Sequence, residues 1–266
     1  MKAQANRIAL IVVCALFNLS FEYSARGIAE LITRPGFTLA LFGIYLTYFA
    51  MLEDLMVRFR LTNRELFLAA FLYGLFPIAF FTRNLFNPDI YKGIMVLGVN
   101  LGTLTIVGIL AWGVVQGVIT LYLANRIWAR DWDHPRMGVI GWILALGYQV
   151  TIIVYAHANP NAPRATPMGY VVFGVLVVVS AILLTRSLSG PRPQPPPFQR
   201  SVVMDLLAVG SLLLFLVLGT LFVSKEKIVT SQPLNLLAVT LENWWTILCG
   251  LVFFVYRALR RSDVAV

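Results

Sequence analysis

Long apolar stretches alternate with short polar segments along this chain of 266 residues. A helix of about 20 apolar residues crosses the roughly 30 Å hydrocarbon core of a membrane, and several stretches reach that length. The pattern predicts an all-α fold, a polytopic integral membrane bundle of about eight transmembrane helices. The predicted helices cover residues 8–32, 37–57, 63–81, 103–126, 138–157, 168–185, 202–223 and 234–257.

Local signals support several of these boundaries. Residues 8–20 follow a short basic start and read like the core of a signal peptide. Phe21, Glu22 and Tyr23 are unlike the small residues of a cleavage site, so we expect a transmembrane helix that continues to Pro35. A capping-box pattern, Thr62 with Glu65, begins the third helix.

The stretch before the fourth helix is harder to assign. Residues 93–127 contain one charge, Arg126, and as a helix they would be about 50 Å long, too long for one simple crossing. We expect a short interfacial helix near 89–100, and whether residues 89–102 instead belong to a crossing stays open. The glycines of helix 103–126 permit close packing, so this helix is the expected contact for a protein partner or a second copy of the chain.

A proline-rich linker at 189–200 divides the chain. It separates a six-helix membrane region, residues 1–188, from a two-helix membrane region, residues 201–266. A run of this kind is a stiff spacer and is expected on the cytoplasmic side.

Composition supports a membrane protein and argues against a nucleic-acid partner. The chain is 59% hydrophobic and 12% charged, with a mean hydropathy of +0.80. Its net charge of +9 comes from Lys and Arg scattered between the apolar stretches, whereas nucleic-acid-binding proteins cluster these residues. With eight crossings, fourteen of the 21 basic residues fall on the side that holds both termini. The positive-inside rule therefore predicts a cell-membrane protein with both termini cytoplasmic.

Polar residues in the first helix form the main candidate site. Asn18, Glu22, Arg26 and Glu30 recur every four residues and would share one helix face. Inserting a charged side chain at the middle of a membrane costs about 2.5 to 3.5 kcal/mol. We therefore expect this row to have a functional or a structural role.

The last helix carries polar residues at a matching depth. It runs antiparallel to the first helix, which places Glu242 and Asn243 in the same outer half of the membrane. We expect Arg26 to bridge Glu22 and Glu242 and these helices to line a pocket open to the outer face. The alternative is a dry, fully paired clamp that only fixes helix packing.

The motif Glu53-Asp54-x-x-x-Arg58 resembles the first motif of intramembrane prenyl-protein proteases. That chemistry also requires histidines at matching depth on later helices. The chain contains His134 and His157, and the predicted topology places His157 at the face opposite Glu53. We therefore expect Glu53, Asp54 and Arg58 to form a charged helix end.

No motif predicts a metal ion or a cofactor. Asp131, Asp133 and His134 offer donor atoms close together, but a solvated turn before Pro135 is the simpler interpretation. Both cysteines, Cys14 and Cys249, lie inside apolar stretches and are expected to be free buried thiols.

Three function classes remain. The first is a transporter or binder of a small polar or amphipathic ligand, with Glu22 as acceptor or proton carrier and Arg26 as an anion contact. The second is a non-catalytic accessory or scaffold subunit of a membrane complex. The third is a membrane-embedded enzyme acting on lipid, for which a convincing set of catalytic residues is missing, so the interpretation leans away from an enzyme.

Overall fold

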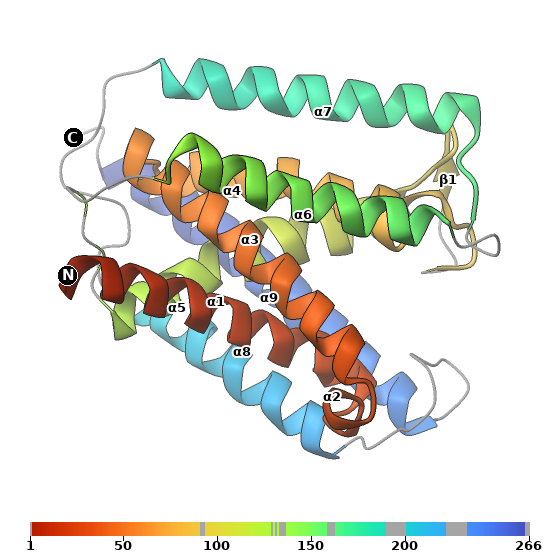
Figure 1. The fold of residues 1–266 in the computed structure, drawn as a ribbon, viewed down its shortest axis with the longest axis horizontal. Coiled ribbons are helices and arrows are strands. Elements are labelled where there is room, and N and C mark those ends of the chain that lie inside the picture. Colours follow the sequence, from red (N-terminus) through yellow and green to blue (C-terminus); the bar gives the residue numbers. More distant parts are fainter. Residues whose placement is uncertain are drawn as a thin grey trace.

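The computed structural model of the chain describes a bundle of helices with one short hairpin (Figure 1). The described residues are 2–90, 94–128, 130, 132, 137–158, 163–189, 201–221 and 233–263. Eight helices in this part of the chain are long and apolar enough to cross a membrane. The predicted fold class, an all-α membrane helix bundle, is confirmed.

The described residues form helices and one pair of short strands. In chain order they are α1 (Lys2–Arg26), α2 (Ala29–Thr33), α3 (Pro35–Phe59), α4 (Asn63–Phe76), η1 (Pro77–Phe81), η2 (Asn84–Phe86), β1 (Met95–Val96), β2 (Val99–Asn100), η4 (Thr103–Ile119), α5 (Thr120–Ile127), α6 (Val139–His157), α7 (Pro167–Leu188), α8 (Val202–Leu221) and α9 (Pro233–Asp263).

The first helix begins and ends about six residues earlier than expected, at Lys2 and Arg26, which corrects its predicted extent of 8–32. It ends at Arg26 because Gly27 adopts a left-handed conformation with φ of 83°. The amide of Ile28 then donates to the carbonyl of Gly219 on α8. Pro35, expected to end this helix, instead occupies the first turn of α3.

Residues 94–100 form a hairpin where an interfacial helix was expected. The strands β1 and β2 pair antiparallel through a turn in which Leu97 and Gly98 both have positive φ. Asn100 holds the turn in place, because its side-chain amide donates to the carbonyls of Asn87 and Ile90. These side-chain bonds satisfy backbone groups that a helix would have paired internally.

Two of the spans contain π-helix. Pro77 begins a short π-helical stretch, η1, that continues the crossing of α4. The segment η4 is π-helical over 17 residues and α5 completes the same crossing. Long π-helix is rare, and π-turns often occur at functional sites. This crossing is also the most buried of the eight, with 67% of its apolar window inside the protein.

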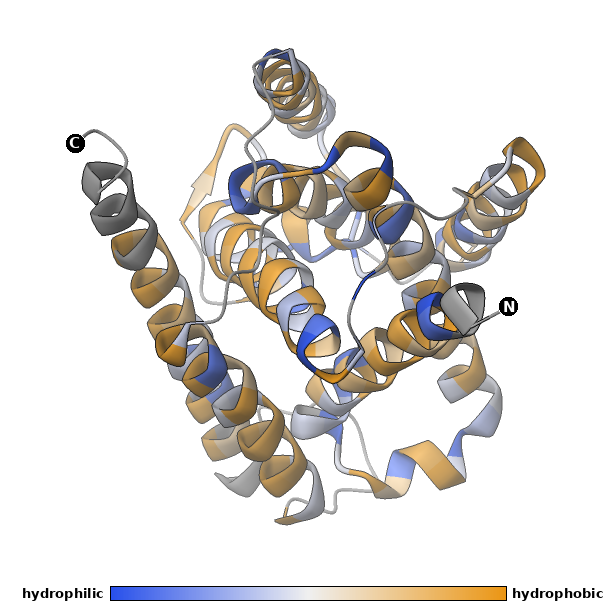
Figure 2. Cartoon of the chain, turned by 90° about the vertical axis from the view of Figure 1, so that its left-hand side faces the viewer, coloured by the Kyte–Doolittle hydropathy of each residue, from blue (hydrophilic) through white to orange (hydrophobic). Residues whose placement is uncertain are grey.

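The helices surround η4 and α1. The α4 helix packs against η4, while α8 and α9 pack against both α1 and η4, so the last two helices belong to the same bundle as the first six. The α6 helix packs on α3 and the α7 helix on α4, and both stand at the outside of the bundle (Figure 2). The glycines of η4 serve contacts within the chain, because Gly113 faces Phe67 and Gly117 faces Ala70.

The two ends of the bundle differ in the elements they expose. The α1 helix begins and α9 finishes at the same end, which we name the terminal end (Figure 1). We name the opposite end, where α1 and α4 finish and the hairpin lies, the distal end.

Candidate functional site

An ion pair on α1 lies near the distal end of the bundle. Arg26 donates to Glu22 from Nε over 2.9 Å and from Nη2 over 2.6 Å. The phenol of Tyr45 on α3 donates to the second carboxylate oxygen of Glu22 over 3.2 Å. The guanidinium also lies 5.1 Å from the centre of the Phe37 ring, a cation–π contact.

The environment keeps Arg26 positively charged. Burial disfavours the cation, but the Glu22 carboxylate outweighs it, and the pKa of Arg26 is raised above its ordinary value. Both side chains stay partly accessible, with 15% of Arg26 and 22% of Glu22 exposed. The protein therefore covers most, but not all, of both side chains.

Glu242 on α9 lies beside this pair and is bound differently from what we expected. The hydroxyl of Ser24 on α1 donates to Oε2 of Glu242 over 2.7 Å. Arg26 forms its ion pair with Glu22 alone, so the expected Arg26 bridge between the two acids is not formed. Among the described residues, no cation lies within ion-pair distance of Glu242.

Two other residues of the predicted site, Glu30 and Asn243, are not part of this group. Glu30 is buried on α2, after the break at Gly27, and forms an ion pair with Arg34 at 3.9 Å. The break in α1 therefore removes Glu30 from the predicted row. Asn243 is half-buried on α9, adjacent to Glu242 in sequence.

Polar groups continue from the ion pair into the middle of the bundle. The amide of Asn18 donates to the Cys14 carbonyl and to the hydroxyl of Thr120 on α5. Oδ1 of Asn18, Oε1 of Gln116 and the Tyr48 hydroxyl are buried without a hydrogen-bond partner in the described part of the protein. An unpaired polar group of this kind costs about 1 to 3 kcal/mol. These atoms suit a ligand that can supply hydrogen bonds.

A second ion pair lies toward the terminal end. Arg130 donates from Nε to both carboxylate oxygens of Glu53, over 2.8 and 2.9 Å. The pair is almost completely buried, and the guanidinium also stacks over Trp132 at 5.3 Å. Cys14 is fully buried on α1, one helical turn before Asn18. Cys14, Asn18 and Glu22 recur every four residues on α1.

We name these groups together the polar row. It consists of Glu242, Ser24, Arg26, Glu22, Tyr45, Asn18, Gln116, Thr120, Tyr48, Cys14, Glu53 and Arg130. The row runs through the bundle from near its distal end to its terminal end.

The neighbouring acid, Asp54, forms the expected pair with Arg58 near the end of α3 and also binds other segments. Its carboxylate is completely buried and accepts bonds from Arg58 over 2.9 Å, Arg7 over 3.3 Å and the Trp142 indole over 3.0 Å. It also accepts a hydrogen bond from the amide of Met137. Asp54 therefore ties α1, α3 and the start of α6 together.

In its described part, the structure brings together neither the residues of the protease motif nor a set of metal ligands. Glu53 is near the last residue of α3, at the terminal end of the bundle. His157 is the last residue of α6, at the distal end of the bundle. No group of three His, Cys, Asp or Glu side chains suited to a metal ion occurs among the described residues. Asp131, Asp133 and His134 lie outside the described residues.

Sequence reasoning missed several members of the polar row. Tyr45, Ser24 and Thr120 are common residue types in membrane helices, and their spacing alone does not reveal which helix they face. Arg130 follows the fourth crossing, 77 positions from Glu53, and the sequence gives no sign that the two residues pair. Comparisons of the chain with protein-family models, with curated proteins and with solved structures find no match.

Proposed function

We propose that this protein is a membrane transporter that carries a small cation along the polar row and exchanges it for a proton at Glu242. The observation that supports this most directly is the acid without a cation beside the Glu22–Arg26 pair. With both acids ionised, this group carries one net negative charge. A negative site inside a membrane favours a cationic ligand or a proton.

The role of Arg26 differs from the anion contact suggested by the sequence. Two of its nitrogens are committed to Glu22, and the Phe37 ring covers it from another side. Arg26 therefore neutralises Glu22 and leaves Glu242 as the acceptor of the ligand. The Ser24 hydroxyl orients one oxygen of Glu242.

The middle of the row supports a route across the membrane. The unpaired oxygens of Asn18 and Gln116 are acceptors, which suit a cation or a hydrogen-bond donor. The Glu53–Arg130 pair closes the row toward the terminal end. Movement past this pair requires it to open, as alternating access implies.

Proteoliposomes test the exchange directly. Purified protein is reconstituted into vesicles that are acidic inside and contain a pH-sensitive dye, and tetramethylammonium, choline or ethidium is added outside. We expect at least one of these cations to make the lumen alkaline. Glu242→Gln should slow the exchange by at least about tenfold, because an amide carries neither the proton nor the charge.

The control for this variant is Asp89→Asn, which makes the same chemical change at an exposed distal acid outside the polar row. It should exchange like the unmodified protein. Equal activity of Glu242→Gln and Asp89→Asn would overturn the role of Glu242. A folded protein that exchanges protons for none of the three cations would overturn the transport proposal.

The two native cysteines report whether water enters the row. Cys14 lies on the polar row, whereas Cys249 contacts Ser211 between α8 and α9, and both are fully buried. In single-cysteine variants, we expect a small cationic thiol reagent to modify Cys14 at least about tenfold faster than Cys249. Equal, negligible rates would indicate a dry structural clamp.

An accessory subunit is the second candidate. The α6 and α7 helices are poorly covered by the chain, with 11% and 17% of their apolar windows buried. A partner in the membrane could pack on these faces, and the expected partner contact through η4 stays a prediction. Co-purification of a stoichiometric membrane protein, together with unreactive Cys14, would favour this candidate over transport.

We infer from the charge distribution that the terminal end lies on the cytoplasmic side of the cell membrane. The described basic residues Arg7, Arg58, Arg60, Arg126 and Arg130 lie on segments at this end. A fluorescent protein fused after Val266 should fluoresce, and alkaline phosphatase fused there should be inactive. The opposite pair of results would reverse the orientation.

A further inference from the structure

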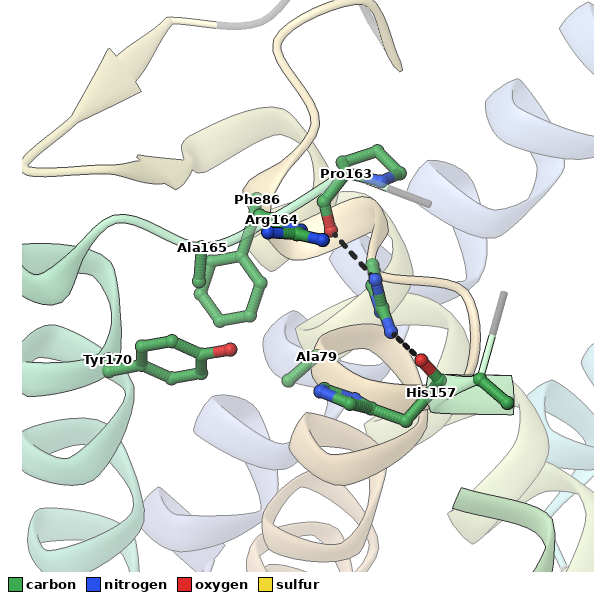
Figure 3. A pocket seen from close by; sticks show the side chains of 9 residues that line it. Ala79, Phe86, His157, Pro163, Arg164, Ala165 and Tyr170 are labelled. Atoms are coloured by element: carbon green, nitrogen blue, oxygen red, sulfur yellow. Dashed lines mark hydrogen bonds between the residues drawn. The ribbon is translucent and has the colours of Figure 1, made fainter. Parts of the chain in front are cut away.

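A cavity of about 480 Å³ opens at the distal end, away from the polar row. It lies between the end of the α4 and η1 crossing, the end of α6, and the start of α7. Ala79, Phe86, His157, Arg164 and Tyr170 are among the residues that line it (Figure 3). A volume of this size is within the range of small-molecule sites.

The lining of the cavity is basic. Arg83, Arg164 and His157 contribute to it, and the nine described lining residues include no acid. The Tyr170 hydroxyl and the His157 imidazole are directed into the same space, below Arg164 (Figure 3). The cavity therefore presents several hydrogen-bond donors and a positive potential.

The backbone holds Arg83 in a defined position. It is 6% exposed, and its Nη2 donates to the carbonyl of His157 over 2.9 Å. Its Nη1 contacts the carbonyl of Pro163 over 3.5 Å. The His157 carbonyl is at the end of α6, where the helix dipole favours a cation. Arg83 therefore joins α6 to the segment that carries Arg164.

Arg164 is exposed and has no protein partner within the described part of the chain. A guanidinium offers a planar set of donors that matches the oxygens of a phosphate group. Arg83 fixes the backbone of Pro163, the residue immediately before Arg164. The Arg164 side chain is therefore presented at the cavity with its donors available.

The cavity lies at the depth of lipid headgroups. His157 ends one membrane span, and Tyr170 belongs to the first turn of another. The helices that continue from these residues, α6 and α7, expose apolar side chains such as Val154 at 63% and Val171 at 59%. An acyl chain could follow these apolar faces while its phosphate remains in the basic cavity.

We propose that this cavity binds a phosphate ester, supplied by the headgroup of an anionic phospholipid or by a small soluble phosphate. Arg164 forms the ion pair with the phosphate, and Tyr170 and His157 supply further hydrogen bonds. The site is independent of the polar row and of the transport proposal.

Binding to the purified full-length chain in a neutral detergent tests this site. The probes are dioctanoyl phosphatidic acid, dioctanoyl glycerol as its phosphate-free match, and inorganic phosphate, each at constant ionic strength. We expect dioctanoyl phosphatidic acid to bind and Arg164→Gln to weaken this binding by at least about tenfold. The matched control is Arg34→Gln, another exposed distal arginine, outside the cavity, which should bind as the unmodified protein does.

The probes also distinguish the two sources of phosphate. Binding of phosphatidic acid without inorganic phosphate supports a lipid headgroup, whereas comparable binding of both supports a soluble phosphate. Tyr170→Phe should lower the affinity less than Arg164→Gln while leaving the thermal stability of the free protein unchanged. The proposal is overturned if no phosphate-bearing probe binds. It is also overturned if Arg164→Gln and Arg34→Gln have equal effects, because that would indicate non-specific attraction to surface charge.

Discussion

The hydroxyl of Ser24 donates to the carboxyl of Glu242 over 2.7 Å, although the two residues are 218 positions apart in the sequence. This bond joins the first and the last membrane helix near the distal end. It also gives Glu242 a fixed orientation beside the Glu22–Arg26 pair, which is where the proposed proton exchange takes place. The bond therefore matters for both stability and the proposed function.

Removing the Ser24 hydroxyl should destabilise the protein. Ser24→Ala leaves the half-buried carboxyl of Glu242 without its donor, and we expect the free energy of unfolding to fall by about 1 to 3 kcal/mol. Equilibrium unfolding in mixed detergent micelles measures the change. The matched control is Ser20→Ala, since Ser20 bonds to the Phe17 carbonyl of its own helix, and its effect should stay within about 0.5 kcal/mol.

A double-mutant cycle separates the bond from other effects of the Ser24 substitution. In a Glu242→Leu background the bond is absent, so Ser24→Ala should then have almost no effect on stability. An unchanged cost in that background would show that Ser24 acts through helix packing and not through Glu242.

The buried Glu53–Arg130 pair predicts a larger effect. Glu53→Gln leaves the Arg130 guanidinium buried without its counter-charge, and we expect a loss of about 3 to 5 kcal/mol in the same unfolding measurement. Replacing both residues with Met should cost less than either single change, because two apolar side chains leave no charge uncompensated.

A solvent-exposed pair provides the comparison for Glu53–Arg130. Arg126 and Asp205 are each about one third exposed, so Arg126→Gln should cost at most about 1 kcal/mol. A loss in Glu53→Gln no larger than in Arg126→Gln would contradict the interpretation of Glu53–Arg130 as a buried ion pair.

Close packing of η4 predicts opposite effects for two glycine substitutions. A Cβ atom at Gly113 would lie 2.6 Å from Cε2 of Phe67, so Gly113→Ala forces that ring to move and should cost about 1 to 3 kcal/mol. Gly147 on α6 has nothing within 4 Å of a built Cβ, and Gly147→Ala should instead stabilise the protein by about 0.5 to 1 kcal/mol. Thermal unfolding of the two variants shows whether each substitution lowers or raises the stability of the protein. Equal destabilisation by both would argue against η4 as the packed centre of the bundle.

The helical segments were predictable because their information is local. A membrane-spanning helix satisfies its own backbone hydrogen bonds, so length and hydropathy over about twenty residues identify it. Caps and pairs within one helix are equally local. The Thr62–Glu65 capping box and the pairs Glu22–Arg26 and Asp54–Arg58 occur at the expected spacing.

Errors arose where a turn depended on backbone conformation or on distant contacts. Gly27 could have continued α1 but takes the left-handed conformation, and the amide of the next residue binds Gly219 on α8. Residues 94–100 became a hairpin because Asn100 reaches back to the carbonyls of Asn87 and Ile90. Hydropathy does not contain this information.

By itself, the sequence determined that this chain is a membrane bundle of eight helices and that polar groups recur on one face of the first helix. Tertiary structure alone decided that Ser24 binds Glu242, that Arg130 reaches Glu53, and that Arg164 borders a basic cavity. The physical reason is that spacing along a helix defines neighbours on that helix. Partners on other helices depend on how each helix is rotated and where it breaks, which packing of the whole bundle determines.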